Sequence, residues 1–124
     1  MDNTSVFLTI PKTDYLIETT SFFAIKDRFP VSPGHSLIIT KKLRKDYFEL
    51  TTEEQAELPT IINLVVEQMQ KEFAPDGFNI GMNCGAAAGQ TVFHFHYHII
   101  PRYNGDMQDP RGGIRHCVTG KGYY

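Results

Sequence analysis

The sequence lacks most of the features that mark a secreted protein, a membrane protein or a zinc-knuckle protein. Of its 124 residues only two are cysteines, Cys84 and Cys117, and they form no Cys-x-x-Cys pair. Neither a disulfide framework nor a zinc knuckle is therefore indicated, and we expect free thiols in a reducing cytoplasm. No stretch approaches the roughly 18 apolar residues of a membrane span. Residues 1–10 also lack the basic start and long apolar run of a signal peptide.

The sequence also has little net charge. Its formal charge is −2, and no Lys/Arg block is long enough to form a basic arm. Electrostatics therefore gives no case for a nucleic-acid or membrane partner, and a small soluble ligand is the better expectation. The chain length suits a single domain that buries about two thirds of the surface exposed by its unfolded form.

The residues that are present predict an α+β fold, with an antiparallel five-stranded sheet and one main helix. Short segments rich in β-branched and aromatic residues are the strand candidates, and loops containing proline, glycine or small residues separate them. The candidate strands span residues 15–18, 21–27, 35–40, 78–83 and 92–100.

The main helix should begin at a capping box and end near Phe73. Thr51 and Glu54 have the spacing at which the threonine hydroxyl and the glutamate carboxylate each bond the other residue's backbone. Pro59 lies inside this helix, where proline costs about 3 kcal/mol, so we expect a kink or local break there. The apolar residues between Ile61 and Met69 should lie on the sheet.

Three histidines alternate with bulky apolar residues in the last candidate strand. Side chains at positions i, i+2 and i+4 leave the same face of a strand, so His94, His96 and His98 should line one surface. Ordinary half-exposed strand residues are the simplest explanation, but three of the five histidines of the chain fall within this one segment. The segment is therefore the leading candidate for a functional site.

A metal site is a second explanation of these histidines. On a strand, however, the Cα atoms of His94 and His98 are roughly 13 Å apart, whereas an ion needs each imidazole nitrogen at about 2.1 Å. Two neighbouring rings could bind one ion, but three could not do so easily, and the sequence offers no Cys pair or acidic cluster as further ligands.

Covalent catalysis is the third explanation. The unperturbed pKa of histidine near 6.5 leaves most of it neutral at pH 7, and a neutral imidazole can attack phosphorus. His96 is central in the segment, so its neighbours could orient it or stabilise charge on phosphate oxygens. The small-residue loop at 84–90 would allow backbone amides to approach an anion closely.

The segment from His94 to Ile100 resembles the signature of the histidine triad superfamily of nucleotidyl hydrolases and transferases. The similarity extends to Ala88-Gly89-Gln90-Thr91-Val92 before it and to Ile100-Pro101-Arg102 after it. With Phe23-Ala24 and Pro33-Gly34-His35, these residues are most similar to the fragile histidine triad branch, the dinucleoside polyphosphate hydrolases. The resemblance covers about residues 15–107.

The resemblance implies a covalent mechanism with four catalytic residues. His96 would attack the α-phosphorus of a dinucleoside polyphosphate, and water would then hydrolyse the nucleotidyl-histidine intermediate. His94 and His98 would hold the nonbridging and leaving-group sides of the phosphate, and Gln90 would contact the phosphate. The backbone carbonyl of His94 is expected to accept the Nδ1 hydrogen of His96.

The resemblance also implies a set of substrate-binding residues. Thr91 would contact the leaving group, Gly89 lies in the loop that approaches the phosphate, and Asp27 would accept hydrogen bonds from the ribose. A turn role for Asp27 remains open. Asn83 would be a further polar contact where this branch more often has glutamine. His35 would lie beneath the triad, either with a direct role or as a buried, hydrogen-bonded support.

The resemblance finally implies an assembly and a domain organisation. Residues 1–108 would form the triad domain, and residues 109–124 a C-terminal tail of the same domain. A homodimer is expected, which the apolar stripe between Ile61 and Met69 would permit. The cysteine pair of some superfamily members is missing near Val6-Phe7-Leu8, so no structural zinc and no bound cofactor are expected. Any Mg²⁺ would arrive with the phosphates of the substrate.

The sequence leaves three other activities open. A purine nucleoside phosphoramidase would use the same residues on an adenosine 5′-phosphoramidate. A nucleotidyltransferase would pass the intermediate to an acceptor other than water. A nucleotide-sensing interaction protein would bind the same ligands, with slow turnover incidental to its role.

Overall fold

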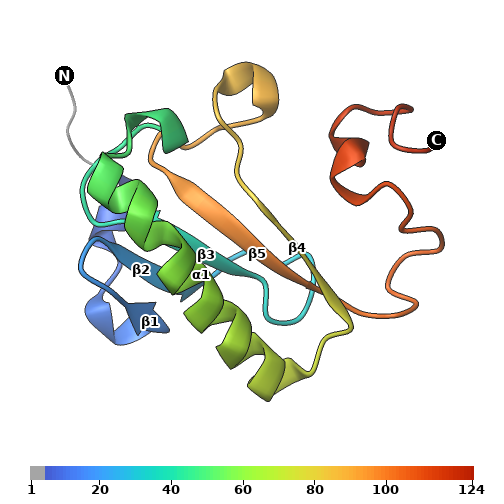
Figure 1. The fold of residues 1–124 in the computed structure, drawn as a ribbon, viewed down its shortest axis with the longest axis horizontal. Helices are drawn as coiled ribbons and strands as arrows, with labels where there is room; N and C mark the ends of the chain where they lie inside the picture. Colours follow the sequence, from blue (N-terminus) through green and yellow to red (C-terminus); the bar gives the residue numbers. More distant parts are fainter. Residues whose placement is uncertain (1–4) are drawn as a thin grey trace.

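A computed structural model describes residues 5–124, which fold into a five-stranded antiparallel sheet with one long helix against it (Figure 1). The predicted α+β fold is confirmed. The strand order is β1-β2-β3-β5-β4, so β5 is an interior strand and β1 and β4 are the edges. The strands are β1 (Ile17–Glu18), β2 (Phe22–Lys26), β3 (Ser36–Thr40), β4 (Gly77–Gly81) and β5 (His96–Arg102), and the helix is α1 (Thr52–Phe73).

The two faces of the sheet are covered by different parts of the chain. On one face, α1 buries Leu58, Ile61, Val65 and Met69 against inward-pointing residues of the strands. On the other face, a smaller cluster consisting of Phe23, Ile25, Leu37 and Ile39 is covered by the N-terminal segment through Phe7, Ile10 and Tyr15. Alternation along each strand assigns neighbouring side chains to opposite faces. His96 and His98 therefore share the N-terminal face, because Tyr97 and Ile99 pack under the helix.

The helix begins as the capping box predicts. The Glu54 backbone N–H donates to Thr51 Oγ1 at 3.1 Å, and Glu54 Oε1 accepts from the Thr51 backbone N–H at 2.8 Å. Pro59 does not break the helix, which is continuous to Phe73, so the expected local break is wrong. Pro59 lies on the exposed side of the helix.

The predicted strand 92–100 is shifted in the structure. Regular pairing begins at His96, which lies opposite Ile39, and continues to Arg102. Because β3 ends at Thr40, residues 92–95 have no regular partner strand, and the Phe95 N–H instead donates to the Arg44 carbonyl at 2.6 Å. His94 therefore lies outside the strand that carries the other two histidines.

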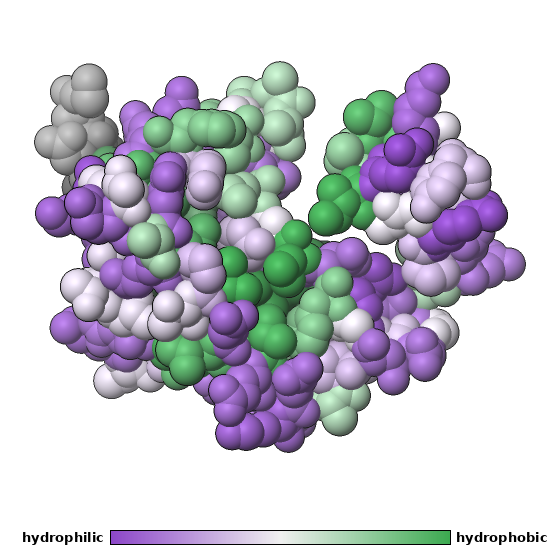
Figure 2. Space-filling model, in the orientation of Figure 1, coloured by the Kyte–Doolittle hydropathy of each residue, from purple (hydrophilic) through white to green (hydrophobic). Residues whose placement is uncertain are grey.

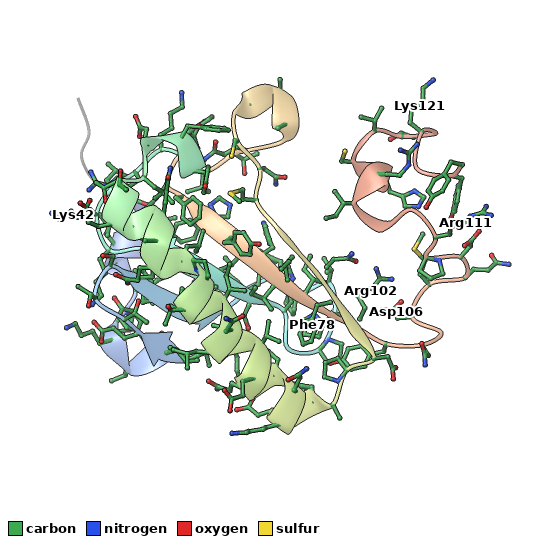
Figure 3. All side chains as sticks on the ribbon, in the orientation of Figure 1. Lys42, Phe78, Arg102, Asp106, Arg111 and Lys121 are labelled. Atoms are coloured by element: carbon green, nitrogen blue, oxygen red, sulfur yellow. The ribbon has the colours of Figure 1, made fainter. Side chains whose placement is uncertain are left out.

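Residues after β5 leave the sheet and form the C-terminal tail. At the junction, Arg102 Nη2 contacts Asp106 Oδ1 at 2.7 Å, and both side chains lie at the end of β5 (Figure 3). The C-terminal tail is stabilised by its own contacts, including a hydrogen bond from Tyr123 Oη to the Asp109 carbonyl at 2.9 Å. In Figure 1 this red segment lies beside the sheet rather than on it. No helix among residues 5–124 has the length and apolarity needed to cross a membrane.

Candidate active site

The hydrogen bonding of His96 leaves one ring nitrogen available for chemistry. His96 Nδ1 lies 2.7 Å from the His94 carbonyl oxygen. A carbonyl can only accept, so Nδ1 carries the proton in the neutral ring and Nε2 has the lone pair. This bond to the carbonyl agrees with the expectation from the resemblance. The tautomer is the one that a nitrogen nucleophile requires.

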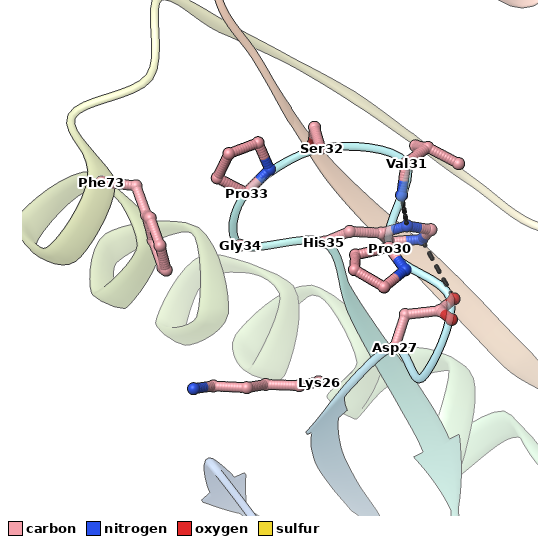
Figure 4. Close-up of a pocket in the computed structure, with 9 residues that line it drawn as sticks. All are labelled: Lys26, Asp27, Pro30, Val31, Ser32, Pro33, Gly34, His35 and Phe73. Carbon is pink, nitrogen blue, oxygen red and sulfur yellow. Dashed lines mark hydrogen bonds and ion pairs between the residues drawn. The ribbon is translucent and has the colours of Figure 1, made fainter.

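His98 is held in the opposite tautomer by a second network. The Val31 N–H donates to His35 Nδ1 at 3.1 Å, so the proton of the neutral His35 ring is on Nε2. His35 Nε2 lies 3.0 Å from His98 Nδ1 and 3.3 Å from Asp27 Oδ2. Figure 4 shows the contacts of His35 with Val31 and Asp27. When His98 Nδ1 accepts from His35, its own proton lies on Nε2, and the ring offers an N–H donor.

Burial keeps the supporting histidines neutral. Burial, together with the neighbouring rings of His35 and His96, lowers the pKa of His98 from 6.5 to about 4, although the Asp27 carboxylate opposes this shift. Burial also lowers the pKa of His35, although the nearby Asp27 carboxylate opposes this shift. At neutral pH both rings are therefore hydrogen-bonding groups rather than cations.

The ring of His94 is not on the open face with the other two, so that part of the predicted arrangement is wrong. The residue is 0% exposed, and its Nε2 lies 2.7 Å from the Thr40 carbonyl oxygen while its Nδ1 lies 2.7 Å from Ser5 Oγ. Burial lowers the pKa of this ring. With both nitrogens engaged inside the protein, the His94 ring cannot hold a phosphate, and its backbone carbonyl is the group that serves His96.

The Gln90 side chain is bonded to the backbone of neighbouring segments in this structure. It is 3% exposed; its Oε1 accepts from the Gly85 N–H at 2.8 Å, and its Nε2 donates to the Lys45 carbonyl at 2.6 Å. A direct bond to phosphate would leave these buried backbone groups unpaired, which costs about 1–3 kcal/mol for each. In this arrangement Gln90 holds the loop before β5, and its contact with phosphate stays a prediction.

A cleft of about 920 Å³ lies over His96 and His98. Its lining includes Thr91 and Asp27, as predicted for substrate-binding residues, and apolar side chains from the N-terminal segment and the sheet. The apolar lining residues include Phe7, Ile10, Leu16, Ile25 and Leu37. The dimensions and the mixed polar and apolar wall suit a nucleoside with its first phosphate.

Two predicted substrate residues lie elsewhere. Asn83 and Gly89 are exposed, and within residues 5–124 neither lines this cleft. The Gly89 backbone N–H is already used, donating to the Ala86 carbonyl at 3.0 Å. Direct binding by these two residues in this arrangement is therefore not supported.

Ser5 and Phe7 are site residues that the sequence pattern did not suggest. Ser5 bonds His94 across 89 positions of sequence, and the Phe7 ring centroid lies 5.1 Å from that of His96. Both precede the segment covered by the triad resemblance, and neither has a neighbouring motif. Only their position over the sheet identifies them.

Asp27, His35 and His98 form the one group of potential metal ligands among the described residues, with ligand atoms within 4.8 Å of one another. The hydrogen bonds do not fit a metal ion. His35 Nδ1 accepts the Val31 N–H, so its Nε2 presents a proton rather than a lone pair. The same residues are fully explained as a hydrogen-bonded support for His98. A second, smaller cavity of about 490 Å³ lies beside this support, under the loop from Pro30 to Gly34 (Figure 4).

Several proteins of known sequence are similar to this chain. An uncharacterized 16.1 kDa HIT-like protein of Mycoplasma pneumoniae is 37% identical over 86 residues, which is 69% of this chain and 60% of that protein. A bis(5′-nucleosyl)-tetraphosphatase (asymmetrical) of Schizosaccharomyces pombe is 39% identical over 80 residues, 64% of this chain and 44% of that protein. An AP-4-A phosphorylase of Mycobacterium tuberculosis is 32% identical over 85 residues, 68% and 44% respectively. This chain thus spans less than two thirds of the length of each of these relatives.

Solved structures share the fold. A HIT family protein from Bacillus anthracis superposes with a TM-score of 0.78 at 34% identity, covering 86% of this chain and 78% of that one. A Zn-bound histidine triad family protein from Mycobacterium smegmatis gives a TM-score of 0.75 at 32% identity, with coverages of 86% and 80%.

The family model described as the HIT domain matches residues 10–105, which include the cleft wall from Ile10, the His35 support and the whole histidine segment. This match spans most of the chain and agrees with the relatives and with the solved structures. The chain belongs to the histidine triad (HIT) family.

Proposed function

We propose that this protein is a hydrolase that cleaves a dinucleoside polyphosphate at its α-phosphate through a nucleotidyl-histidine intermediate on His96. The observation that carries the proposal is the bond from His96 Nδ1 to the His94 carbonyl, which leaves the Nε2 lone pair of His96 on a ring that lines the cleft. A neutral, oriented imidazole is a competent nucleophile for phosphorus.

The proposed reaction has two displacements. In the first, His96 Nε2 forms a bond to the α-phosphorus, and the bond from phosphorus to the bridging oxygen breaks, so that the remaining nucleotide leaves with the electron pair. In the second, water forms a bond to the same phosphorus and loses a proton to solvent, and the electron pair of the phosphorus–nitrogen bond returns to Nε2. The products are a nucleoside monophosphate and the leaving nucleotide.

The His98 N–H is the proposed stabiliser of charge in both displacements. The donor chain from Val31 through His35 orients this N–H toward the cleft face, and the low pKa of His98 keeps the ring neutral. A preorganised donor at a developing phosphate charge is worth most where water is partly excluded. Asp27 retains lone pairs for ribose hydroxyls, although Oδ1 already accepts from the Phe29 N–H at 2.8 Å.

A nucleotidyltransferase that uses inorganic phosphate as acceptor is the second candidate. The observation that favours it is the 32% identical relative named AP-4-A phosphorylase. The first displacement would be the same, and phosphate in place of water would attack the intermediate. Any Mg²⁺ in either reaction would be carried by the substrate phosphates.

We also propose that the protein acts as a homodimer joined over the helix face. Leu64 and Ile80 are exposed there, and Ile62, Val66, Phe78 and Met82 are only partly buried. Figure 2 shows apolar side chains gathered between the helix and the tail. Contiguous exposed apolar area of this kind is typical of an interaction surface.

Rapid quenching tests the function. The protein is mixed with diadenosine tetraphosphate, with adenosine 5′-phosphoramidate, or with diadenosine tetraphosphate plus inorganic phosphate, and the products and the protein mass are measured. The proposal expects AMP and ATP from the first mixture and a protein adduct of the mass of an adenylyl group, which His96→Gly abolishes. Turnover of only the phosphoramidate, or a phosphate requirement, would select one of the alternatives. Unchanged turnover in His96→Gly would reject all three activities.

A further inference from the structure

A single hydroxyl connects the N-terminal turn to the histidine segment. Ser5 caps the 3₁₀ turn η1 (Val6–Thr9), and its Oγ accepts from the Phe7 N–H at 3.2 Å. The same Oγ lies 2.7 Å from His94 Nδ1. The hydroxyl can therefore accept the Phe7 N–H on one lone pair and donate its single hydrogen to His94. Its second lone pair is not needed for either contact.

The donor direction of the Ser5–His94 bond follows from the other side of the ring. His94 Nε2 lies 2.7 Å from the Thr40 carbonyl, which can only accept, so Nε2 carries the proton of the neutral ring. Nδ1 is then a lone pair, and Ser5 Oγ–H must donate to it. The ring is fully buried, and burial lowers the pKa of His94, so the neutral form is the one that this network stabilises.

The Ser5 bond acts on the reacting histidine by two routes. Through the covalent chain, the seating of the His94 ring fixes the position of its own carbonyl, which accepts from His96 Nδ1 at 2.7 Å. Through the turn, it holds Phe7 against both rings, at 5.6 Å from the His94 centroid and 5.1 Å from the His96 centroid. Phe7 and Ile10 are also part of the cleft wall.

We infer that Ser5 is a positioning residue of the active site: its hydroxyl locks the N-terminal turn onto His94, which completes one wall of the cleft and sets the ring of His96. The effect of Ser5 on catalysis rests on the proposed function. The hydrogen bond from Ser5 to His94 is a property of the fold and does not depend on that function. A residue outside the histidine segment thereby controls the orientation of the nucleophile.

The test compares Ser5→Ala with Ser5→Thr and Leu8→Ala. Ser5→Ala removes the hydroxyl; Ser5→Thr keeps it and keeps helix-capping ability. Leu8→Ala alters the same turn at a side chain that is 42% exposed and lies outside the cleft lining. Each protein is measured for kcat and KM with diadenosine tetraphosphate, for affinity to AMP, and for the imidazole ¹⁵N shifts of His94.

Ser5→Ala is expected to lower kcat/KM about tenfold, equivalent to about 1.4 kcal/mol, with a fall in kcat and a rise in KM. It is also expected to weaken AMP binding and to move the His94 Nδ1 resonance toward that of an unbonded lone pair. Ser5→Thr should restore all of these, and Leu8→Ala should leave them unchanged.

Two results would overturn the inference. One is a Ser5→Ala protein that loses only thermal stability while kcat, KM and the His94 ¹⁵N shifts stay at wild-type values. The other is an equal loss in Leu8→Ala, which would assign the effect to the turn as a whole. If the wild-type protein hydrolyses none of the nucleotides, the proposed function fails, but AMP affinity and the ¹⁵N shifts still decide whether the lock exists.

Discussion

The two histidines on either side of His96 have the same spacing in sequence but different environments in the fold. His94 is enclosed, with one nitrogen on Thr40 and the other on Ser5. His98 lies on the cleft, with one nitrogen on His35 and the other available. Alternation along the sequence alone therefore does not assign a role to a histidine. His94 precedes β5 and is buried, whereas His98 lies within β5 and faces the cleft.

The largest expected effect separates these two environments. His98→Ala should lower kcat by about 10²–10³-fold, because the oriented N–H donor is lost, while the free energy of unfolding changes by no more than about 1 kcal/mol. His94→Ala should lower the free energy of unfolding by about 3 kcal/mol, because it opens a cavity and leaves the Thr40 carbonyl unpaired. Urea unfolding and steady-state kinetics on both variants make the measurement. Equal stability losses would contradict the distinction.

A smaller effect is expected from the residue behind His98. His35→Phe removes the donor to His98 Nδ1. It should lower kcat about tenfold, because the lost hydrogen bond contributes about 1.4 kcal/mol to holding the His98 ring in its orientation. His35→Gln retains an N–H donor at a similar reach and is the matched control. If the two variants have the same kcat, the hydrogen bond does not orient His98. Product release measured in single turnovers then shows whether another step limits the rate.

The free energy of unfolding should depend on pH, because the surroundings of His94 and of His98 both keep buried histidines neutral. The folded-state pKa values of His35, His94 and His98 are lowered by burial, that of His98 to about 4, below the ordinary value of 6.5. Lowered values mean that the unfolded chain binds protons first, so stability is fully present above pH 6.5 and is lost as the pH falls toward 4. Unfolding midpoints measured between pH 8 and pH 4 test this. A flat profile over that window would contradict neutral burial, and His98→Ala should flatten it in part.

The smallest expected effect is that of a substitution at the helix cap, which lies away from both His94 and His98. It serves as a control for the other variants. Thr51→Ala removes the hydroxyl that accepts from the Glu54 N–H and should lower the free energy of unfolding by about 1 kcal/mol. Thr51→Ser keeps the cap and should be close to wild type. Because α1 lies on the face opposite the cleft, kcat and KM should not change in either variant. A change in kcat would mean that the two faces of the sheet are coupled.

Sequence patterns predicted helices and strands well where the interactions that form them join residues close together in sequence. The capping box at Thr51 and Glu54 involves groups three residues apart, and both of its hydrogen bonds form. The β-branched and aromatic segments became strands within a few residues of their expected limits, because side-chain packing on a sheet has period two. The effect of Pro59 was not predicted correctly, because a proline on the exposed side of a helix does not have to end it.

Roles that depend on distant partners were not predictable in the same way. Gln90 has a side chain suited to a phosphate, but its amide is consumed by the Gly85 and Lys45 backbones, the second of them 45 residues away. Asn83 and Gly89 are near the histidines in sequence, yet neither lines the cleft. Neither the backbone bonding of Gln90 nor the position of Asn83 and Gly89 can be inferred from residue spacing or composition.

The linear chain alone specifies the family, the α+β layers and the segment that holds the reacting group, because a period-two pattern and a short histidine motif need no distant information. Folding decides which of the three rings reaches the cleft, since that depends on where β3 ends and where Ser5 lies. It also decides which nitrogen of His94 and of His98 carries the proton. A tautomer is set by hydrogen-bond partners, and Ser5, Thr40 and His35 come from other parts of the chain, whereas His96 is set by the nearby His94 carbonyl.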